Sequence, residues 1–480
     1  MSILVVDGGT SSVRAAIVHP DATVTHEISA MTLPDSPMPG IVEFDAAAYA
    51  AAALDCARQV LAAHGPVEAV GITTQRASVV VWDRATGQPV APAQGWQDLR
   101  TVGDCLVLAA EGIRLAPNQS ATKIANILDT VDPERTRDLC VGTVDSWIAW
   151  NLTEGAHHVS DLSNAAVWGL LDGTTQGLSA TVMDRLRIPA AALPRVVDST
   201  GMVGEATALD GAPPICGIAG DQQSSLVGQG CTLPGLAKAT FGTGGMLDVN
   251  LGDAAPAAAA RGEAGTFPIV CWRQDGRAQW GAEGIMLSAG TNVEWLRDDL
   301  GIIPTAEASA EVAASVPDTD GAMYVPALLG LGTPNWDYGA RGTLLGLTRG
   351  TTAAHIVRAV LEGVAQRGAD LVDAAQADTG ITLDHLRVDG GMSTNPVFTQ
   401  ALADATQLPV EVSPVTEATA LGAGFLAGLA VGTWGSWEEL AATWSPARQV
   451  EPGAPTDRDR WRDAVGRAGE WFGDLSAIDF

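Results

Sequence analysis

The feature that most constrains the fold is a glycine hairpin near the start of the chain. Its turn, Asp7-Gly8-Gly9-Thr10-Ser11-Ser12-Val13-Arg14, lies between two apolar runs, residues 3–6 and 15–18. This order predicts a strand, a tight turn and a second strand. Glycines let the backbone approach a ligand closely, and such a turn presents successive N–H groups and small hydroxyls. The loop therefore suits a phosphate and Asp7 suits a phosphate-bound Mg²⁺, although an ordinary surface turn has the same local pattern.

A second hairpin of the same kind occurs in the other half of the chain. Lys238-Ala239-Thr240-Phe241 runs into Gly242-Thr243-Gly244-Gly245, and the apolar pattern resumes over residues 246–249. The repetition indicates a duplicated unit. Strands and helices alternate around both hairpins, and helical spacing is clear over 46–64, 353–377 and 418–430. We predict two α/β domains, 1–232 and 233–480, that hold a nucleotide in a cleft between them.

Composition excludes several classes of function. The chain has 480 residues, too many for one hydrophobic core, and its formal net charge of −29 argues against nucleic acid or an anionic membrane as a partner. Its apolar runs are shorter than the roughly 18 residues of a membrane helix, and no signal peptide is visible. The six cysteines form no CxxC pair, which is typical of a cytoplasmic protein with reduced thiols. Only two lysines, Lys123 and Lys238, are present.

The glycine-rich loops together resemble the FGGY family of carbohydrate kinases over nearly the whole chain. The most specific match is a C-terminal pattern, Gly342-Thr343-Leu344-Leu345-Gly346-Leu347, then seven residues, then His355-Ile356 and Ala359-Val360-Leu361-Glu362. Within the family, the motifs are most similar to those of the glycerol kinases over residues 71–76, 95–98, 142–147, 219–223 and 338–342. The resemblance implies an α/β fold of two actin/hexokinase-like (ribonuclease H-like) domains with an interdomain cleft.

The resemblance also implies a site for ATP and Mg²⁺. The positions that match the two phosphate loops and the nucleotide-contacting segments are Thr10, Ser11, Ser12, Arg14, Gly242, Thr243, Gly290, Gly391 and Asn395. Asp7 and Asp221 are the candidate carboxylates for the metal. Because Mg²⁺ keeps much of its hydration shell, we expect Asp7 to act through water.

Asp221 matches the catalytic base of the family, and a carboxylate at a strand end is a natural acceptor for the proton of an alcohol. Positions that match polyol contacts are Arg76, Trp96 and Gln222, and Asn118 occupies a further substrate-facing position. Outside this context each residue has a simpler role. Asp221 would cap a helix, Arg76 would pair with a surface carboxylate, and Trp96 would belong to the core.

Four positions depart from the pattern of the glycerol kinases. Ala77 replaces an acidic residue, Asn118 a tyrosine, Asn126 a tryptophan, and Glu294 a glutamine near the adenine. Two polar partners of glycerol are therefore absent, and a site built to hydrogen-bond a hydroxyl discriminates strongly when a partner is lost. Smaller side chains also leave room, so the departures favour a larger polyol or an open-chain sugar over glycerol.

The sequence thus predicts ATP-dependent phosphorylation of a hydroxyl of a small polyol or sugar, with a tetritol, pentitol or ketopentose as alternatives. An actin-like or chaperone-like ATPase would share the hairpins but would lack the motif 219–223 and the C-terminal pattern. A sugar sensor without catalysis is a third alternative, against which Asp7 and Asp221 both argue. Dimers and tetramers are common among the relatives, so a homo-oligomer is compatible with the resemblance.

Overall fold

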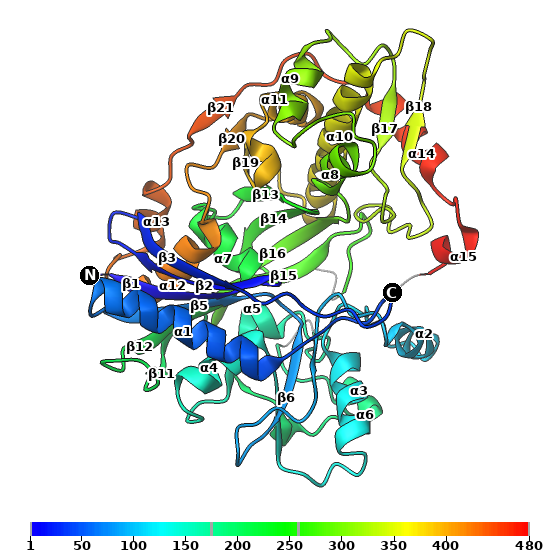
Figure 1. Ribbon diagram of the computed structural model, residues 1–480. Helices are drawn as coiled ribbons and strands as arrows, with labels where there is room; N and C mark the ends of the chain where they lie inside the picture. Colours follow the sequence, from blue (N-terminus) through cyan, green and yellow to red (C-terminus); the bar gives the residue numbers. More distant parts are fainter. Residues whose placement is uncertain (1, 173–175, 257–259, 479–480) are drawn as a thin grey trace.

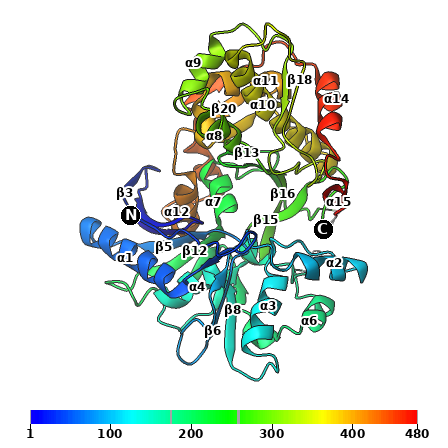
Figure 2. The same ribbon diagram turned by 45° about the vertical axis from the view of Figure 1, so that its right-hand side comes forward.

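The computed structural model describes residues 2–172, 176–256 and 260–478. Two lobes are visible, and each is built on a mixed sheet (Figures 1 and 2). The sheet of the first lobe has the order β11-β12-β5-β1-β2-β3. Its strands are β1 (Ile3–Gly8), β2 (Ser12–Val18), β3 (Val24–Met31), β5 (Ala69–Thr74), β11 (Thr200–Glu205) and β12 (Pro214–Gly220).

A second, smaller sheet lies beyond the first in the same lobe. It has the order β4-β7-β6-β8, and β9 pairs with β10 nearby. The strands are β4 (Glu43–Phe44), β6 (Val79–Asp83), β7 (Ala93–Gln94), β8 (Leu139–Thr143), β9 (Val159–Asp161) and β10 (Arg195–Val197). The helices of this half are α1 (Ala46–His64), α2 (Val102–Ala110), α3 (Ala121–Val131), α4 (Val144–Leu152), α5 (Leu162–Ala165), α6 (Ala180–Leu186), η1 (Ala190–Ala192) and α7 (Asp221–Gly228).

The sheet of the second lobe has the order β15-β16-β14-β13-β19-β20-β21, and β17 pairs with β18 outside it. The strands are β13 (Ala237–Phe241), β14 (Gly245–Gly252), β15 (Phe267–Gln274), β16 (Arg277–Met286), β17 (Met323–Val325), β18 (Thr343–Leu345), β19 (Leu386–Asp389), β20 (Val410–Val412) and β21 (Arg448–Val450). The helices are α8 (Thr291–Asp298), α9 (Ala308–Ala314), α10 (Ala353–Thr379), η2 (Gly391–Thr394), α11 (Pro396–Thr406), α12 (Ala418–Val431), α13 (Trp437–Ala442), α14 (Arg458–Ala468) and α15 (Gly473–Ser476).

Local sequence signals account for the long helices. The Asp45 carboxylate accepts hydrogen bonds from the first N–H groups of α1, and Gly65 ends this helix with φ +97°. Gly380 ends α10 in the left-handed region. The three helices predicted from periodicity are confirmed, with ends that differ by no more than two residues from those expected.

Helix α12 comes from the second half of the chain but packs on the sheet of the first lobe. Leu421 and Ala423 share a core cluster with Ile3 and Val5 of β1. Gly422 faces the Ser224 carbonyl of α7 so closely that a side chain would collide with it. Figure 2 shows α7 and α12 lying between the two sheets. Glycine and alanine are required here because the two backbones are nearly in contact, and the two helices join the lobes.

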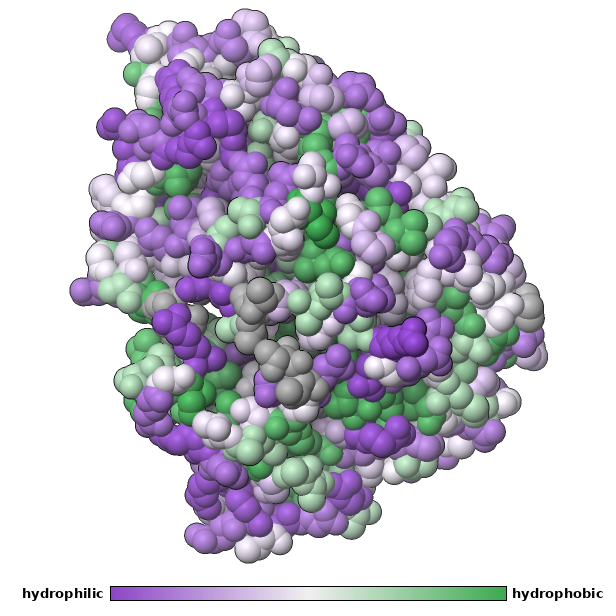
Figure 3. Space-filling view, turned by 180° about the vertical axis from the view of Figure 1, so that it is seen from behind, coloured by the Kyte–Doolittle hydropathy of each residue, from purple (hydrophilic) through white to green (hydrophobic). Residues whose placement is uncertain are grey.

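The surface is mostly hydrophilic on one face of the molecule (Figure 3). On the face in Figure 3, hydrophilic residues cover much of the area and hydrophobic residues form smaller groups. All six cysteines are buried and unpaired. Across the described parts of the chain, no helix combines the length and the hydropathy that a membrane crossing demands.

Candidate active site

The carboxyl ends of three neighbouring strands bring the predicted site together. Asp7 of β1 and Ala219 of β12 are both in register with Thr73, on either side of the central strand β5. Asp221 follows directly after β12 as the first residue of α7. Arg76 comes two residues after the end of β5. Parallel strands place their carboxyl ends at one edge of a sheet, so these side chains share that edge.

Asp221 has the surroundings of a functional carboxylate. Its side chain is one-third exposed and lies 3.7 Å from Arg76 Nε. It accepts the N–H of Gln222 at 2.8 Å, so it also supports the start of α7. Loss of surrounding water raises the pKa of Asp221, and the Arg76 charge opposes that rise. A raised pKa makes a carboxylate a stronger base.

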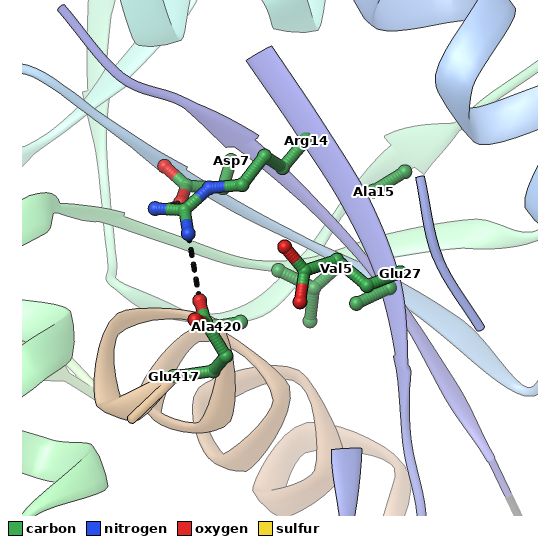
Figure 4. Close-up of a pocket in the computed structure, with 8 residues that line it drawn as sticks. Val5, Asp7, Arg14, Ala15, Glu27, Glu417 and Ala420 are labelled. Carbon is green, nitrogen blue, oxygen red and sulfur yellow. Dashed lines mark hydrogen bonds and ion pairs between the residues drawn. The ribbon is translucent and has the colours of Figure 1, made fainter. Parts of the chain in front are cut away.

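The first hairpin carries two half-buried ion pairs next to its tip, both made by Arg14. Arg14 Nη2 lies 2.8 Å from Asp7 Oδ2, and Arg14 Nη1 lies 2.7 Å from Glu417 Oε2, just before α12. Figure 4 shows Arg14 directed toward Glu417, with Glu27 also on the pocket wall. Burial raises the pKa of Asp7 to about 6, Arg14 opposes the rise, and repulsion from Asp221 adds to it. Asp7 and Asp221 are therefore close enough to interact electrostatically.

The hydroxyls of the first hairpin lie beside the predicted substrate wall. Trp96 Nε1 donates to Thr10 Oγ1 at 3.1 Å, which joins the tryptophan to the phosphate loop. Ser11 is exposed and Ser12 is half-buried. The hydroxyl of Tyr49 donates to the Gly9 carbonyl at 2.7 Å. The hydrogen bond from Tyr49 thus fixes the backbone of the loop, while the hydroxyls of the loop remain accessible.

The second hairpin is held by backbone contacts instead. Gly242 O accepts the Gly290 N–H at 2.8 Å, and Thr243 O accepts the Ala289 N–H at 2.9 Å. A side chain at position 290 would lie 2.6 Å from Gly242 O, so glycine is required there. The Thr243 side chain is exposed at the tip. The start of α8 and the hairpin therefore form one continuous surface of backbone groups.

Gly391 and Asn395 lie beyond β19. Gly390 has φ +84° and approaches the Phe241 carbonyl, which leaves the exposed Gly391 at the surface. Asn395 accepts the N–H groups of Val397 and Phe398 at 3.0 and 3.2 Å and donates to Ser309 Oγ at 3.0 Å. Asn395 therefore caps α11 and links it to α9. Any contact of Asn395 with adenosine would be made by a side chain that these hydrogen bonds hold in place.

Asn118 is exposed on the loop before α3. Within residues 2–172, 176–256 and 260–478, no hydrogen bond joins its side chain to Arg76 (whose side-chain partners are Glu283 and Asp221), Trp96 or Asp221. Lys123 Nζ donates to the carbonyls of Pro117 and Gln119 at 2.6 and 2.8 Å and so fixes this loop. Burial lowers the pKa of Lys123 to about 7.

Sequence reasoning missed four charged residues that contact the predicted site. Glu417 holds Arg14, and Glu283 Oε2 lies 2.7 Å from Arg76 Nη2. Lys238 Nζ lies 2.8 Å from Asp248 Oδ2 and donates to Gln222 Oε1 at 2.7 Å. A usable signal was present, because Lys238 is one of two lysines in a chain whose other cations are arginines. Both lysines are fully buried.

Kinases and actin-like ATPases can both have two lobes that each present a phosphate-type hairpin, so similarity to known proteins is needed to separate them. Models of the N-terminal and C-terminal domains of the FGGY family of carbohydrate kinases match residues 2–228 and 237–431. A glycerol kinase from Aromatoleum aromaticum is 44% identical over 98% of this chain and 99% of its own. One from Bordetella parapertussis is 42% identical over 98% and 97%. The chain therefore belongs to the FGGY family of carbohydrate kinases.

Solved structures agree with this assignment. Plasmodium falciparum glycerol kinase with ADP superposes with a TM-score of 0.89 at 27% identity and covers 100% of this chain and 99% of its own. A ligand-bound xylulose kinase from Lactobacillus acidophilus has a TM-score of 0.86 at 18% identity, with 99% and 98% covered, and supports the fold alone. The fold class predicted from the sequence is confirmed. The chain is an ATP-dependent kinase that phosphorylates a hydroxyl of a small polyol or sugar.

Proposed function

We propose that Asp221 is the general base that accepts the proton of the alcohol as its oxygen attacks the terminal phosphoryl group of ATP. The observation that supports this role is its position. The carboxylate is one-third exposed, lies at the strand edge that also carries Asp7, and is 3.7 Å from Arg76. Phosphoryl transfer depends on alignment and charge neutralisation more than on covalent help. Arg76, Gln222, Asn118 and Trp96 would bind and orient the alcohol.

The nucleotide would be held between the hairpins. Thr10, Ser11 and Ser12 would contact phosphate oxygens from the first lobe, with Arg14 released from its ion pairs to join them. From the second lobe the contacts would come from Gly242, Thr243, Gly290, Gly391 and Asn395. The exposure of Ser11 and Thr243 at the two tips supports this arrangement.

A Mg²⁺ ion fits the residues present. Asp7 and Asp221 are two hard oxygen donors, and the Asp221 charge helps to raise the pKa of Asp7. A cation between them would relieve that repulsion. When bound, the ion neutralises phosphate charge in the transition state. We also propose the division into domains at residues 232 and 233, a cytoplasmic location and a homo-oligomer.

The alcohol that fits best is a polyol or open-chain sugar longer than glycerol. Ala77 is small and buried beside Arg76, and Asn118 is exposed rather than packed against that arginine. Neither residue supplies the partners that the glycerol kinases use at these positions. Glycerol is the second candidate, because relatives with that name are 40–44% identical to this chain.

A coupled ADP assay with Mg²⁺ and ATP tests the proposal. The panel contains glycerol, tetritols, pentitols and ketopentoses, and a reaction without any alcohol is the control. We expect ADP release to depend strongly on the alcohol and kcat/KM to be higher for a four- or five-carbon substrate than for glycerol. A higher kcat/KM for glycerol would refute the size argument. ADP release that is independent of every alcohol would refute the kinase role and favour an ATPase.

A further inference from the structure

Three charged residues form a row across the sheet of the second lobe, and the same register continues from Lys238 to Arg387 of β19 and Glu411 of β20. Lys238 of β13 pairs in register with Asp248 of β14, and Asp248 pairs in register with Glu283 of β16. Lys238 and Asp248 are fully buried, and Glu283 is 5% exposed. In-register positions on adjacent strands point to the same face of a sheet. The row therefore lies on one face, and that face contacts the first lobe.

Both ends of the row contact residues proposed to bind the alcohol. At one end, Lys238 Nζ donates to Gln222 Oε1 at 2.7 Å, and Thr240 Oγ1 lies 3.1 Å from the same nitrogen. At the other end, Glu283 lies 2.7 Å from Arg76 Nη2. Through this row, charged side chains of the second lobe contact Gln222 and Arg76 of the first lobe.

Hydrogen-bond chemistry sets the direction of the Gln222 amide. An ammonium group has only donors, so it can bond only the oxygen of that amide. The NH₂ group of Gln222 is consequently turned away from Lys238, free to donate to a hydroxyl oxygen. Without Lys238 the amide would have no such preference and would rotate.

Asp248 keeps Lys238 in its charged form. Burial alone lowers the pKa of a lysine, but the charges of Asp248, Asp389 and Glu283 together outweigh that effect and the pKa of Lys238 is raised. A buried ion pair rarely stabilises a fold more than an apolar pair of similar size. At the corresponding register of the first hairpin, Val5 is paired with Ala16. Fold stability therefore gives no reason for charges at this position of the second hairpin.

We propose that Lys238, held by Asp248, is a positioning residue that orients the Gln222 amide for recognition of a substrate hydroxyl. The inference rests on the proposed role of Gln222 in alcohol binding. It assigns to the second lobe a part in selecting the alcohol, in addition to its part in binding the nucleotide.

The test replaces the pair as a unit, with Lys238→Met and Asp248→Leu combined. Lys238→Met alone would leave a buried carboxylate without a cation and is expected to destabilise the protein. The double variant replaces both charged side chains with apolar ones and should fold. The matched control is Arg387→Met with Glu411→Leu. That cross-strand pair, 3.4 Å apart, lies in the same sheet with Arg387 in register with Lys238. It contacts Gln229 and Trp444 rather than the proposed alcohol site.

The readout uses the best alcohol from the panel. We expect the Lys238→Met/Asp248→Leu variant to raise the KM for that alcohol about tenfold, as for one lost hydrogen bond. The KM for ATP and the thermal midpoint should stay close to those of the control variant. A double variant that folds and keeps the wild-type alcohol KM would overturn the proposal.

A double-mutant cycle with Gln222→Ala identifies the route of the effect. In the wild type, Gln222→Ala should raise the alcohol KM about tenfold. In the Lys238→Met/Asp248→Leu background it should add less than about twofold, because the amide is already misoriented. Equal effects in both backgrounds would overturn the proposal. If the wild type uses no alcohol in the panel, the proposed function itself has failed, and the inference fails with it.

Discussion

The two hairpins share their topology but place their charges differently. In each, an antiparallel pair lies beside a parallel strand, β5 for the first and β19 for the second. Near the first tip, Asp7 is paired with Arg14, whereas the corresponding pair in the second hairpin is Thr240 and Met246. Two residues further from the tip, the first hairpin has Val5 and Ala16. At that register the second hairpin has Lys238 and Asp248.

This difference indicates a division of work between the lobes. Charge at a hairpin tip can act on phosphate or metal, whereas charge further down the strands can act only on side chains packed against them. We therefore propose that the first hairpin contributes charge to the nucleotide end of the site, and that the second contributes neutral backbone groups there and its charge to the alcohol end.

The largest effect is expected at Asp221, which belongs to neither hairpin. Its loss is the reference with which the effects at the two hairpins are compared. Asp221→Asn should lower kcat about 10²–10⁴-fold because the proton acceptor is lost, while ATP still binds. Steady-state kinetics and calorimetry with ATP measure the two effects. Near-normal turnover by a folded variant would remove Asp221 from the role of base.

The next largest effect tests the charge at the first tip. Asp7→Asn should lower kcat about 10²–10³-fold, the scale for loss of one preorganised electrostatic group. The matched variant at the corresponding position of the second hairpin is Thr240→Val, for which we expect a much smaller loss. Similar losses of kcat from the two substitutions would contradict the proposed difference between the two hairpins.

In the first lobe, a pH effect on stability should come from Asp145. Asp145 and Asp161 lie there without an ion pair to any described residue, whereas Asp248 and Glu283 of the second lobe each have a cation. Burial raises the pKa of Asp145 to about 6, with Asp161 adding to the rise. The folded state thus favours the protonated form, and this contribution is complete below about pH 4 and lost as pH rises through 6.

Asp145→Asn removes that dependence. The unfolding free energy of the variant, relative to the wild type, should rise by up to about 3 kcal/mol between pH 4 and pH 7. Urea denaturation at several pH values measures it. Asp98→Asn is the control of opposite sign, since bonds to Arg100 lower the pKa of Asp98 despite its burial. Parallel pH curves for wild type and Asp145→Asn would contradict the prediction.

The smallest effect is expected at the neutral second tip. Thr243→Leu should weaken ATP binding about tenfold, because a bulky apolar side chain replaces one hydroxyl contact and crowds the backbone groups. The KM for the alcohol should not change and serves as the internal control. Unchanged ATP affinity by calorimetry would show that this tip does not contact the nucleotide.

Much of the site follows from local sequence. Asp7 and the two glycine turns are predicted because each lies within a few residues of a strand end, where periodicity and turn chemistry are informative. Asp221 is predicted as the base because its motif resembles that of the FGGY family. Arg14 was predicted as a phosphate ligand, but in the structure it pairs with Asp7 and Glu417. Glu417 lies 403 residues away along the chain, and no local pattern could join the two.

The sequence by itself determined the hairpins, the long helices and the family, because these depend on residues near one another along the chain. Only the tertiary structure decided which residues meet across the lobes: Lys238 with Gln222, Arg76 with Glu283, and α12 with the sheet of the other lobe. The physical reason is that an ion pair depends on distance and burial in space. Both are set only when the two lobes pack together around α7 and α12.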